Sequence, residues 1–299
     1  MCHDSHQTLN SWDVEDANLI DPVIDGLTQL PQLEELCLRF QSPQSHNLRN
    51  FIFPLERFCH RSLCRISLTH ASEVFGEDLT QQLSKIVKQN PLLTHLDFEF
   101  TDGTRLGNCT FHTLVRDIPK GSPLPLRHLR LRGCHLSFDN STLSHLKFLS
   151  SIDISSSLDS NYDHLWLALA NTATWLKEIS VDKVSQNLLE YLTLYSGLTK
   201  FCYIDKYDQP CQKADVHRFF SIVLPMHQNL LSTLTISTHS PDFWCITPVY
   251  MTPILALQQI KSLTVTLAFD AISSGHFDGI PLLVSFLLQG TFRIELTLI

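Results

Sequence analysis

The chain has 299 residues, of which 43% are hydrophobic and 17% are charged, a composition that is ample for a continuous core and excludes a wholly disordered protein. Of its 30 acidic residues, eight precede Arg39, the first basic residue, which leaves 22 acids against 22 Lys and Arg in the rest of the chain. Because domains that bind nucleic acids are usually basic, this balance argues against a nucleic-acid partner.

The sequence also contains no segment typical of export or membrane insertion. It begins without the basic and apolar stretches of a secretory signal. The longest mostly apolar stretch, residues 280–288, is about nine residues long, whereas roughly 20 are needed to cross a bilayer. The nine cysteines are an odd number without paired spacing, which favours free thiols in a reducing compartment. We therefore expect a cytoplasmic or nuclear protein with no membrane association.

A pattern of apolar residues, apolar-x-x-apolar-x-apolar, recurs along the chain and predicts its main strands. The nine copies begin at Leu33, Leu63, Leu93, Leu126, Leu149, Leu176, Leu198, Leu231 and Ile260. In each copy the last two apolar residues are two positions apart, so they lie on the same side of a strand and point inward. One copy alone is an ordinary amphipathic segment, but nine copies spaced 22 to 33 residues apart predict parallel strands stacked as a solenoid.

The segments between these strands have the spacing of helices. The first has apolar residues at Leu79, Leu83, Ile86 and Val87, preceded by acids and followed by Asn90-Pro91. Residues 165–176 and 216–230 have similar patterns. The expected fold class is therefore α/β, a leucine-rich-repeat solenoid (horseshoe) with a parallel concave sheet and a helical convex side, joined by right-handed crossovers.

The most specific repeat covers residues 126–136, with the sequence Leu-Arg-His-Leu-Arg-Leu-Arg-Gly-Cys-His-Leu. It matches the whole eleven-residue consensus of the leucine-rich repeat, with Cys134 in the Asn/Cys position. The other repeats depart from the consensus at that position. We therefore expect irregular turns without a continuous ladder of asparagine side chains.

Both ends of the chain continue the repeat pattern. Leu9, Trp12 and Val14 fit the same template upstream of the first full copy, and alternating apolar residues over 292–298 predict a final strand. We expect residues 1–299 to form a single leucine-rich-repeat domain of about nine to eleven irregular repeats, apparently uncapped at both ends.

The long irregular repeats, the cysteine in the consensus turn and the opening Leu-Pro-Gln-Leu-Glu-Glu-Leu at residues 30–36 resemble the leucine-rich-repeat region of fungal F-box proteins. In that family an N-terminal F-box binds the adaptor of a cullin ubiquitin ligase, and the repeats select the substrate. The resemblance covers residues 9–299 and implies a substrate-recognition module. No proline-and-leucine three-helix segment like an F-box precedes the first repeat, so the adaptor is an expected partner only if an F-box lies upstream of Met1.

The sequence offers little for catalysis or metal binding. It contains no glycine-rich phosphate loop, nucleophile elbow, HExxH or kinase signature. The tightest group of metal-ligand residues is Cys59, His60 and Cys64, but no second pair of ligands follows at the spacing of structural zinc sites. We expect a protein that is not an enzyme and that holds no cofactor or metal.

The outward residues of the central strands are the candidate binding site. They are His95, Asp97, Glu99, His128, Arg130, Arg132 and Asp153. Two interpretations remain open: these charges neutralise one another across strands, or they form a surface for a protein partner. The favoured function is a protein–protein interaction module that resembles the substrate-recognition part of an F-box receptor. The alternative is a free-standing scaffold or inhibitor that binds a protein in its concave face.

Overall fold

The computed structural model describes residues 20–30, 33–40, 62–70, 77–100, 110–119, 121–133, 138–155, 162–205, 212–238, 243–267 and 293–298. Its strands are β1 (Glu35–Phe40), β2 (Arg65–His70), β3 (His95–Phe100), β4 (His128–Arg132), β5 (Ser151–Ser155), β6 (Glu178–Val181), β7 (Lys200–Ile204), β8 (Thr233–Ser237), β9 (Ser262–Leu267) and β10 (Arg293–Leu298). Its α-helices are α1 (Ile20–Thr28), α2 (Glu77–Gln89), α3 (Phe111–Val115), α4 (Asn140–Leu143), α5 (Asp163–Asn171), α6 (Gln186–Leu192), α7 (Lys213–Arg218), α8 (Leu224–His227) and α9 (Pro248–Leu255). The chain divides into two compact units, the first made of residues 1–149 and 155–162 and the second of residues 150–154 and 163–299.

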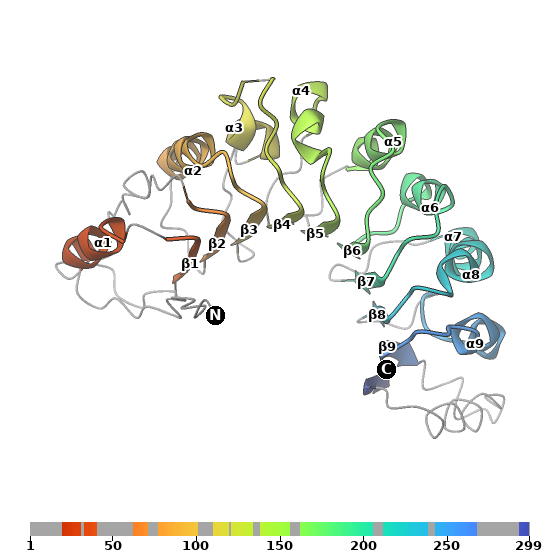
Figure 1. Cartoon of the computed structure of the whole chain (residues 1–299). Coiled ribbons are helices and arrows are strands. Elements are labelled where there is room, and N and C mark those ends of the chain that lie inside the picture. Colours follow the sequence, from red (N-terminus) through yellow and green to blue (C-terminus); the bar gives the residue numbers. More distant parts are fainter. Residues whose placement is uncertain are drawn as a thin grey trace, which may run out of the picture. The chain divides into compact units, whose positions relative to one another are not determined.

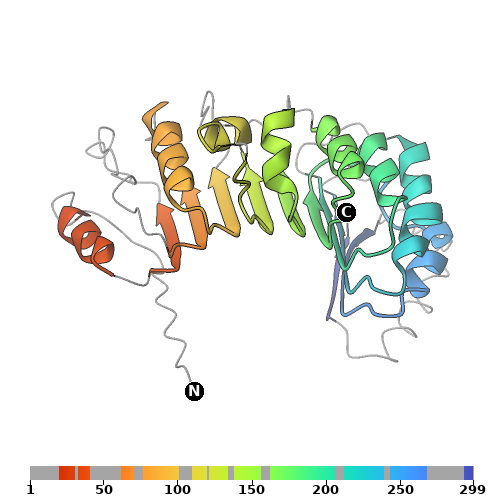
Figure 2. The same ribbon diagram turned by 45° about the horizontal axis from the view of Figure 1, so that its top comes forward.

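In the first unit, β1 to β4 pair in parallel and in chain order, and every predicted inward residue has the predicted neighbour. Leu96 pairs with Leu129 and Phe98 with Leu131. The helices between the strands lie on one face of the sheet, with α2 beside α3 and α3 beside α4 (Figures 1 and 2). Among the described residues of either unit, no helix covers the other face of the strands, which we call the open face of that unit.

The second unit repeats this arrangement from β5 to β10, again with parallel pairing and with α5 to α9 on one side of the strands (Figure 1). The strand predicted from the alternation over 292–298 is present as β10, which pairs in parallel with β9. Leu9, Trp12 and Val14 lie outside the described residues. The fold is therefore an α/β solenoid of the leucine-rich-repeat type, as the sequence predicts.

Burial follows the predicted alternation in β4, β6, β7 and β8, whereas the outward residues Ser151 and Ser155 of β5 and Thr266 of β9 are also buried. In β4, Leu129 and Leu131 are fully buried, whereas the three polar residues between and beside them are partly exposed. The apolar residue that begins each copy of the pattern is also buried, because it lies in the turn where the helix returns to the sheet. Each repeat thus contributes a small cluster to a core that continues from one repeat to the next.

Successive turns are joined to one another by hydrogen bonds where the strands begin. The residue just before a strand donates its backbone N–H to the equivalent residue of the preceding repeat, as Arg127 does to Thr94 at 2.8 Å. Where that residue carries a hydroxyl, the side chain adds a second bond: Thr94 Oγ1 donates to the Cys64 carbonyl at 3.1 Å and Ser232 Oγ to the Thr199 carbonyl at 3.0 Å. These bonds fix the offset between neighbouring strands.

The helix predicted over 216–230 is present but interrupted. α7 and α8 are joined by a π-helical turn over Phe219–Val223, which ends two residues before Pro225. Proline has no N–H to donate to the carbonyl four residues earlier, and its ring clashes with that carbonyl. A wider turn relieves this clash, so the chain continues as one helical segment up to His227.

His227 is a buried histidine that the sequence pattern does not single out. Its Nδ1 accepts a hydrogen bond from the Leu198 backbone N–H at 3.3 Å, so Nε2 carries the proton and donates to the Leu192 carbonyl at 3.1 Å. His145 in the first unit accepts the Leu124 N–H in the same way, at 3.2 Å. Burial lowers the pKa of His227 to about 4, and the bond to Leu192 offsets only part of this effect. Both imidazoles hold turns while neutral, because a protonated Nδ1 cannot accept an N–H.

The first prediction tests the core assignment by making the same substitution at a buried and an exposed leucine. Leu131→Ala should lower the free energy of unfolding by about 2 to 5 kcal/mol, because Leu131 is 1% exposed and its removal leaves a cavity. Leu92→Ala, at a side chain that is 56% exposed, should change it by less than about 0.5 kcal/mol. Urea unfolding followed by far-ultraviolet circular dichroism measures both. Equal losses in the two variants would contradict the assignment.

The second prediction concerns acid stability. Since His227 binds a proton less readily when folded than when unfolded, its contribution to stability is complete above pH 6.5 and is lost between pH 6.5 and about 4. A shift of this size corresponds to a loss of about 3 kcal/mol. His227→Gln should remove most of this pH dependence, whereas His217→Gln, at an exposed histidine of the same helical segment, should preserve it. Urea midpoints at several pH values, read from tryptophan fluorescence, test this; identical curves for both variants would refute it.

Candidate functional site

Six of the seven predicted site residues lie together on the open face of the first unit. β3 and β4 pair so that His95 lies opposite His128, Asp97 opposite Arg130 and Glu99 opposite Arg132. All six are partly exposed. The alternation that buries Leu129 and Leu131 is the reason, because residues between two inward positions must point to the other face.

Arg130 is held by carboxylates from the neighbouring strand. Its Nη2 donates to Glu99 Oε2 at 2.7 Å, and its Nη1 lies 3.5 Å from Asp97 Oδ2. Glu99 also meets Arg132, whose Nη1 lies 3.7 Å from Glu99 Oε1. The Arg130 side chain is only 28% exposed, so these charge-assisted contacts fix its position on the open face.

Asp97 is the fourth charged residue of this group, after Arg130, Glu99 and Arg132, and its burial costs free energy. Its side chain is 19% exposed, and its Oδ1 is buried and accepts no hydrogen bond from any residue that the structure describes. A buried acceptor left without a donor costs about 1 to 3 kcal/mol, part of which the nearby guanidinium of Arg130 offsets. A cluster that served stability alone would gain from a donor at this oxygen.

At the other end of the same strands, two imidazole rings stack. The ring centroids of His95 and His128 lie 5.7 Å apart at 30°. Thr94 Oγ1 gives its proton to the Cys64 carbonyl, so the 2.8 Å contact with His95 Nδ1 is an N–H donated by the imidazole. Burial lowers the pKa of His95, and the neighbouring basic residues, with Arg65 the largest contributor among them, lower it further.

Asp153, the seventh predicted residue, belongs to β5 and to the second unit. There it lies opposite Ser180 and is partly exposed. Its negative charge is one cause of the raised pKa of Cys202, whose main cause is burial. The open face of this unit is otherwise mostly Ser and Thr, as the sequence indicates, with Ser151 donating to Glu178 at 3.2 Å.

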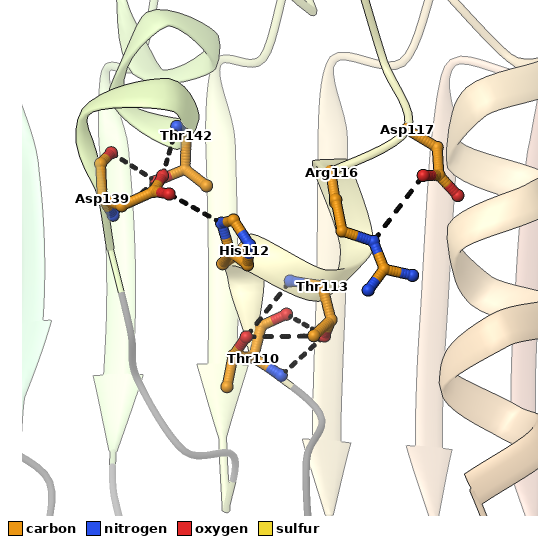
Figure 3. A network of polar contacts seen from close by, with 7 residues as sticks. All are labelled: Thr110, His112, Thr113, Arg116, Asp117, Asp139 and Thr142. Carbon is orange, nitrogen blue, oxygen red and sulfur yellow. Dashed lines mark hydrogen bonds and ion pairs between the residues drawn. The ribbon is translucent and has the colours of Figure 1, made fainter.

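On the helical side of the first unit, polar contacts cap the helices that precede and follow β4. α3 precedes β4 and is capped by Thr110, whose Oγ1 accepts from the Thr113 backbone N–H at 3.1 Å (Figure 3). Asp139, which follows β4, accepts the Thr142 N–H at 2.9 Å at the start of α4. Figure 3 shows His112 of α3 pointing toward Asp139, with His112 Nδ1 and Asp139 Oδ2 3.0 Å apart. The helices before and after β4 are thus joined to each other.

Sequence reasoning missed two parts of this site. Arg65 lies in register with His95 on β2 and pairs with Glu35 at 3.6 Å, so the charged surface reaches β1. The Thr94 hydroxyl orients His95 from outside the strand. The register of the repeats does place Arg65 on the same face as His95, although it is not among the predicted site residues. The contact from the turn residue Thr94 depends on the turn's geometry, which the pattern does not contain.

The chemistry available here is binding through charges and hydrogen bonds. Among the described residues, His, Cys, Asp and Glu form no group of three or more that could hold a metal ion, and Cys59 and His60 of the predicted cluster lie outside them. Cys37, Cys64, Cys202 and Cys245 form no disulfide bonds. None of the helices in the described ranges is both long and apolar enough to cross a membrane.

Comparison with known proteins identifies no family for this chain. No protein-family model matches the chain, and no curated protein has a matching sequence. The evidence for the fold is therefore the repeat pattern and the structure. Membership of the F-box family is a hypothesis based on the resemblance of the repeats.

The third prediction asks how strongly Arg130 and Glu99 are coupled. A double-mutant cycle with Arg130→Ala and Glu99→Ala should give a coupling energy of about 1 kcal/mol, because both side chains are more than two-thirds buried and 2.7 Å apart. The matched cycle on Arg116 and Asp117, a pair at 3.6 Å that is at least half exposed (Figure 3), should give a value near zero. Urea unfolding measures both cycles. A coupling no larger than the control would mean that Arg130 is not held in place.

Proposed function

We propose that the chain is a protein–protein interaction module whose binding surface is the open face of the first unit. The observation that carries the proposal is the fixed position of Arg130 between Asp97 and Glu99. A guanidinium held in place loses little side-chain entropy on binding, and arginine is favoured among the residues that dominate interface energies. The Asp97 oxygen that accepts no hydrogen bond from the described residues supports the same view, because fold stability alone does not favour it.

The charged residues of β3 and β4 could neutralise one another or bind a protein partner, and the same contacts are compatible with both roles. We favour partner binding. Neutralisation accounts for Glu99, which meets both arginines. It leaves unexplained why charged groups, and not threonines as in β8 and β9, fill the middle of this face at a cost in desolvation. Arginine is enriched at surfaces that bind proteins, and the stacked rings of His95 and His128 lie on the same face as Arg130 and Arg132.

The role that we propose for this module is substrate recognition in the cytoplasm or nucleus, like that of the repeat region of F-box receptors. Its support is the resemblance of the repeats and the position of the charged cluster on the face that such solenoids use for binding. The cullin adaptor is a further partner if an F-box lies upstream of Met1. Co-purification of the natural protein with that adaptor separates this role from that of a free-standing scaffold.

The fourth prediction tests the surface. Arg130→Glu with Arg132→Glu should weaken partner binding by about 2 kcal/mol or more, about thirtyfold, because charge pairs buried in an interface are costly to break. The control, Lys85→Glu with Lys88→Glu, makes the same change in charge on exposed residues of α2 on the opposite side of the sheet. Partners captured by the unaltered chain are identified by mass spectrometry, and their affinities for each variant are then measured by biolayer interferometry.

Binding of the same captured partners to further variants tests whether the site lies in the second unit instead. Arg130→Gln with Arg132→Gln removes the two positive charges without placing new acids beside Asp97 and Glu99. This variant replaces the Arg130→Glu, Arg132→Glu variant in the binding test if the latter does not fold. Thr235→Ala with Thr264→Ala alters the open face of the second unit and should leave affinity unchanged. Loss of binding in the threonine variant, together with full binding in the arginine variants, would place the site in the second unit.

A further inference from the structure

Two buried histidines occupy the same position in two different repeats. His145 and His227 each lie four residues before the apolar residue that begins their copy of the repeat pattern. Through Nδ1, each imidazole accepts a backbone N–H from the preceding repeat, that of Leu124 at 3.2 Å and that of Leu198 at 3.3 Å. The other copies have no histidine at this position, so the bond is a feature of these two repeats and not of the repeat pattern.

In the first unit, this hydrogen bond lies directly ahead of the strand that carries the two arginines. His145 belongs to a 3₁₀ turn, Ser144–Leu146, that continues α4, and it is 2% exposed. Leu124 belongs to residues 121–127, which form neither a helix nor a strand and lead into β4. The bond therefore ties the segment before β4 to the helical segment after it.

Leu124 is close in sequence to the first bonds between β3 and β4. The backbone N–H groups of Arg127 and His128 both donate to the Thr94 carbonyl, at 2.8 and 3.0 Å. The side chains of Leu124 and Leu126 are buried immediately before these donors. Release of the Leu124 N–H therefore loosens the end of β4 where its pairing with β3 begins, in a local opening that leaves the rest of the fold intact.

The bond requires a neutral imidazole, because a protonated Nδ1 carries its own hydrogen and cannot accept the Leu124 N–H. Burial lowers the pKa of His145 from its ordinary value of 6.5, and it is the one cause of the shift. Several charged or titratable side chains lie on neighbouring described segments, and none of them alters the pKa of His145: His112, Arg116, Asp117, Arg127, Asp139 and Lys147.

We propose that protonation of His145 releases the Leu124 N–H and loosens the start of β4, so that acid weakens the open face of the first unit. A buried imidazolium that faces a backbone N–H is unfavourable, and opening of the turn lets it reach water. The opened segment binds the proton at the ordinary pKa of 6.5, whereas the closed segment binds it only at lower pH. The contribution of His145 to the stability of this segment is therefore complete above pH 6.5 and is lost as the pH falls below it.

The opening itself does not depend on what the open face binds. Its consequence rests on the proposed function: partner binding through Arg130 and Arg132 weakens as the pH falls below about 6.5. Failure of the opening would leave the proposed function standing, because it concerns how β4 is held and not which residues meet the partner.

The fifth prediction uses hydrogen exchange of the full chain, read by mass spectrometry and corrected for intrinsic exchange rates. Between pH 7.0 and pH 5.5, the opening constant of residues 121–132 should rise about fivefold, because the opened segment gains a proton at His145. His145→Asn should abolish this rise, since Oδ1 of asparagine takes the place of Nδ1 and accepts an N–H at either pH. The matched control is His227→Asn, which should keep the rise in residues 121–132 and abolish the corresponding rise in residues 193–204 of the second unit.

A second readout needs no substitution and serves if His145→Asn does not fold. In nuclear magnetic resonance spectra of the unaltered chain, the Cε1 proton of His145 should titrate below pH 6.5, and the Leu124 amide should lose protection as the pH falls from 6.5. A rise that persists in His145→Asn would assign it to His95 or His128 and overturn the inference. So would its absence from the unaltered chain, its loss in His227→Asn, or a His145 titration at or above pH 6.5.

Discussion

The apolar side of each strand is covered only when a neighbouring repeat and a helix pack against it. Leu129 and Leu131 of β4 are buried beside Leu96 and Phe98 of β3, and the same pairing recurs in both units. Because one repeat cannot cover this side alone, stability depends on consecutive repeats in a single register. The hydroxyl and backbone bonds that join successive turns hold that register where the strands begin.

The register also determines the open face. Residues between inward positions must face outward, so charges placed at alternate positions of neighbouring strands become neighbours in space. Arg130 meets Asp97 and Glu99 for this reason, and His95 stacks on His128 for the same reason. A one-residue slip would bury the charges and expose the leucines together, which ties the proposed binding surface to the core beneath it.

The alternation was sufficient to predict β1 to β10, their parallel order and the outward residues of β3 and β4. It could not predict features that depend on how turns and helices pack. His227 and His145 are buried because their nitrogens meet particular backbone N–H groups, and a lone histidine at the end of a helix carries no sign of this. The π-helical turn before Pro225 and the orientation of Arg130 similarly depend on contacts between segments that are distant in sequence or on backbone detail.

The register of β3 and β4 is the claim on which core and surface both depend, and nuclear Overhauser effects between labelled side chains measure it most directly. In a chain with methyl-labelled leucine and ring-labelled phenylalanine, cross-peaks should join Leu96 to Leu129 and Phe98 to Leu131, the pairs that lie opposite each other. A slipped register would instead give cross-peaks between Leu96 and Leu131 without the Phe98 to Leu131 contact. That pattern would contradict both the pairing of the core residues and the position of Arg130 opposite Asp97 on the open face.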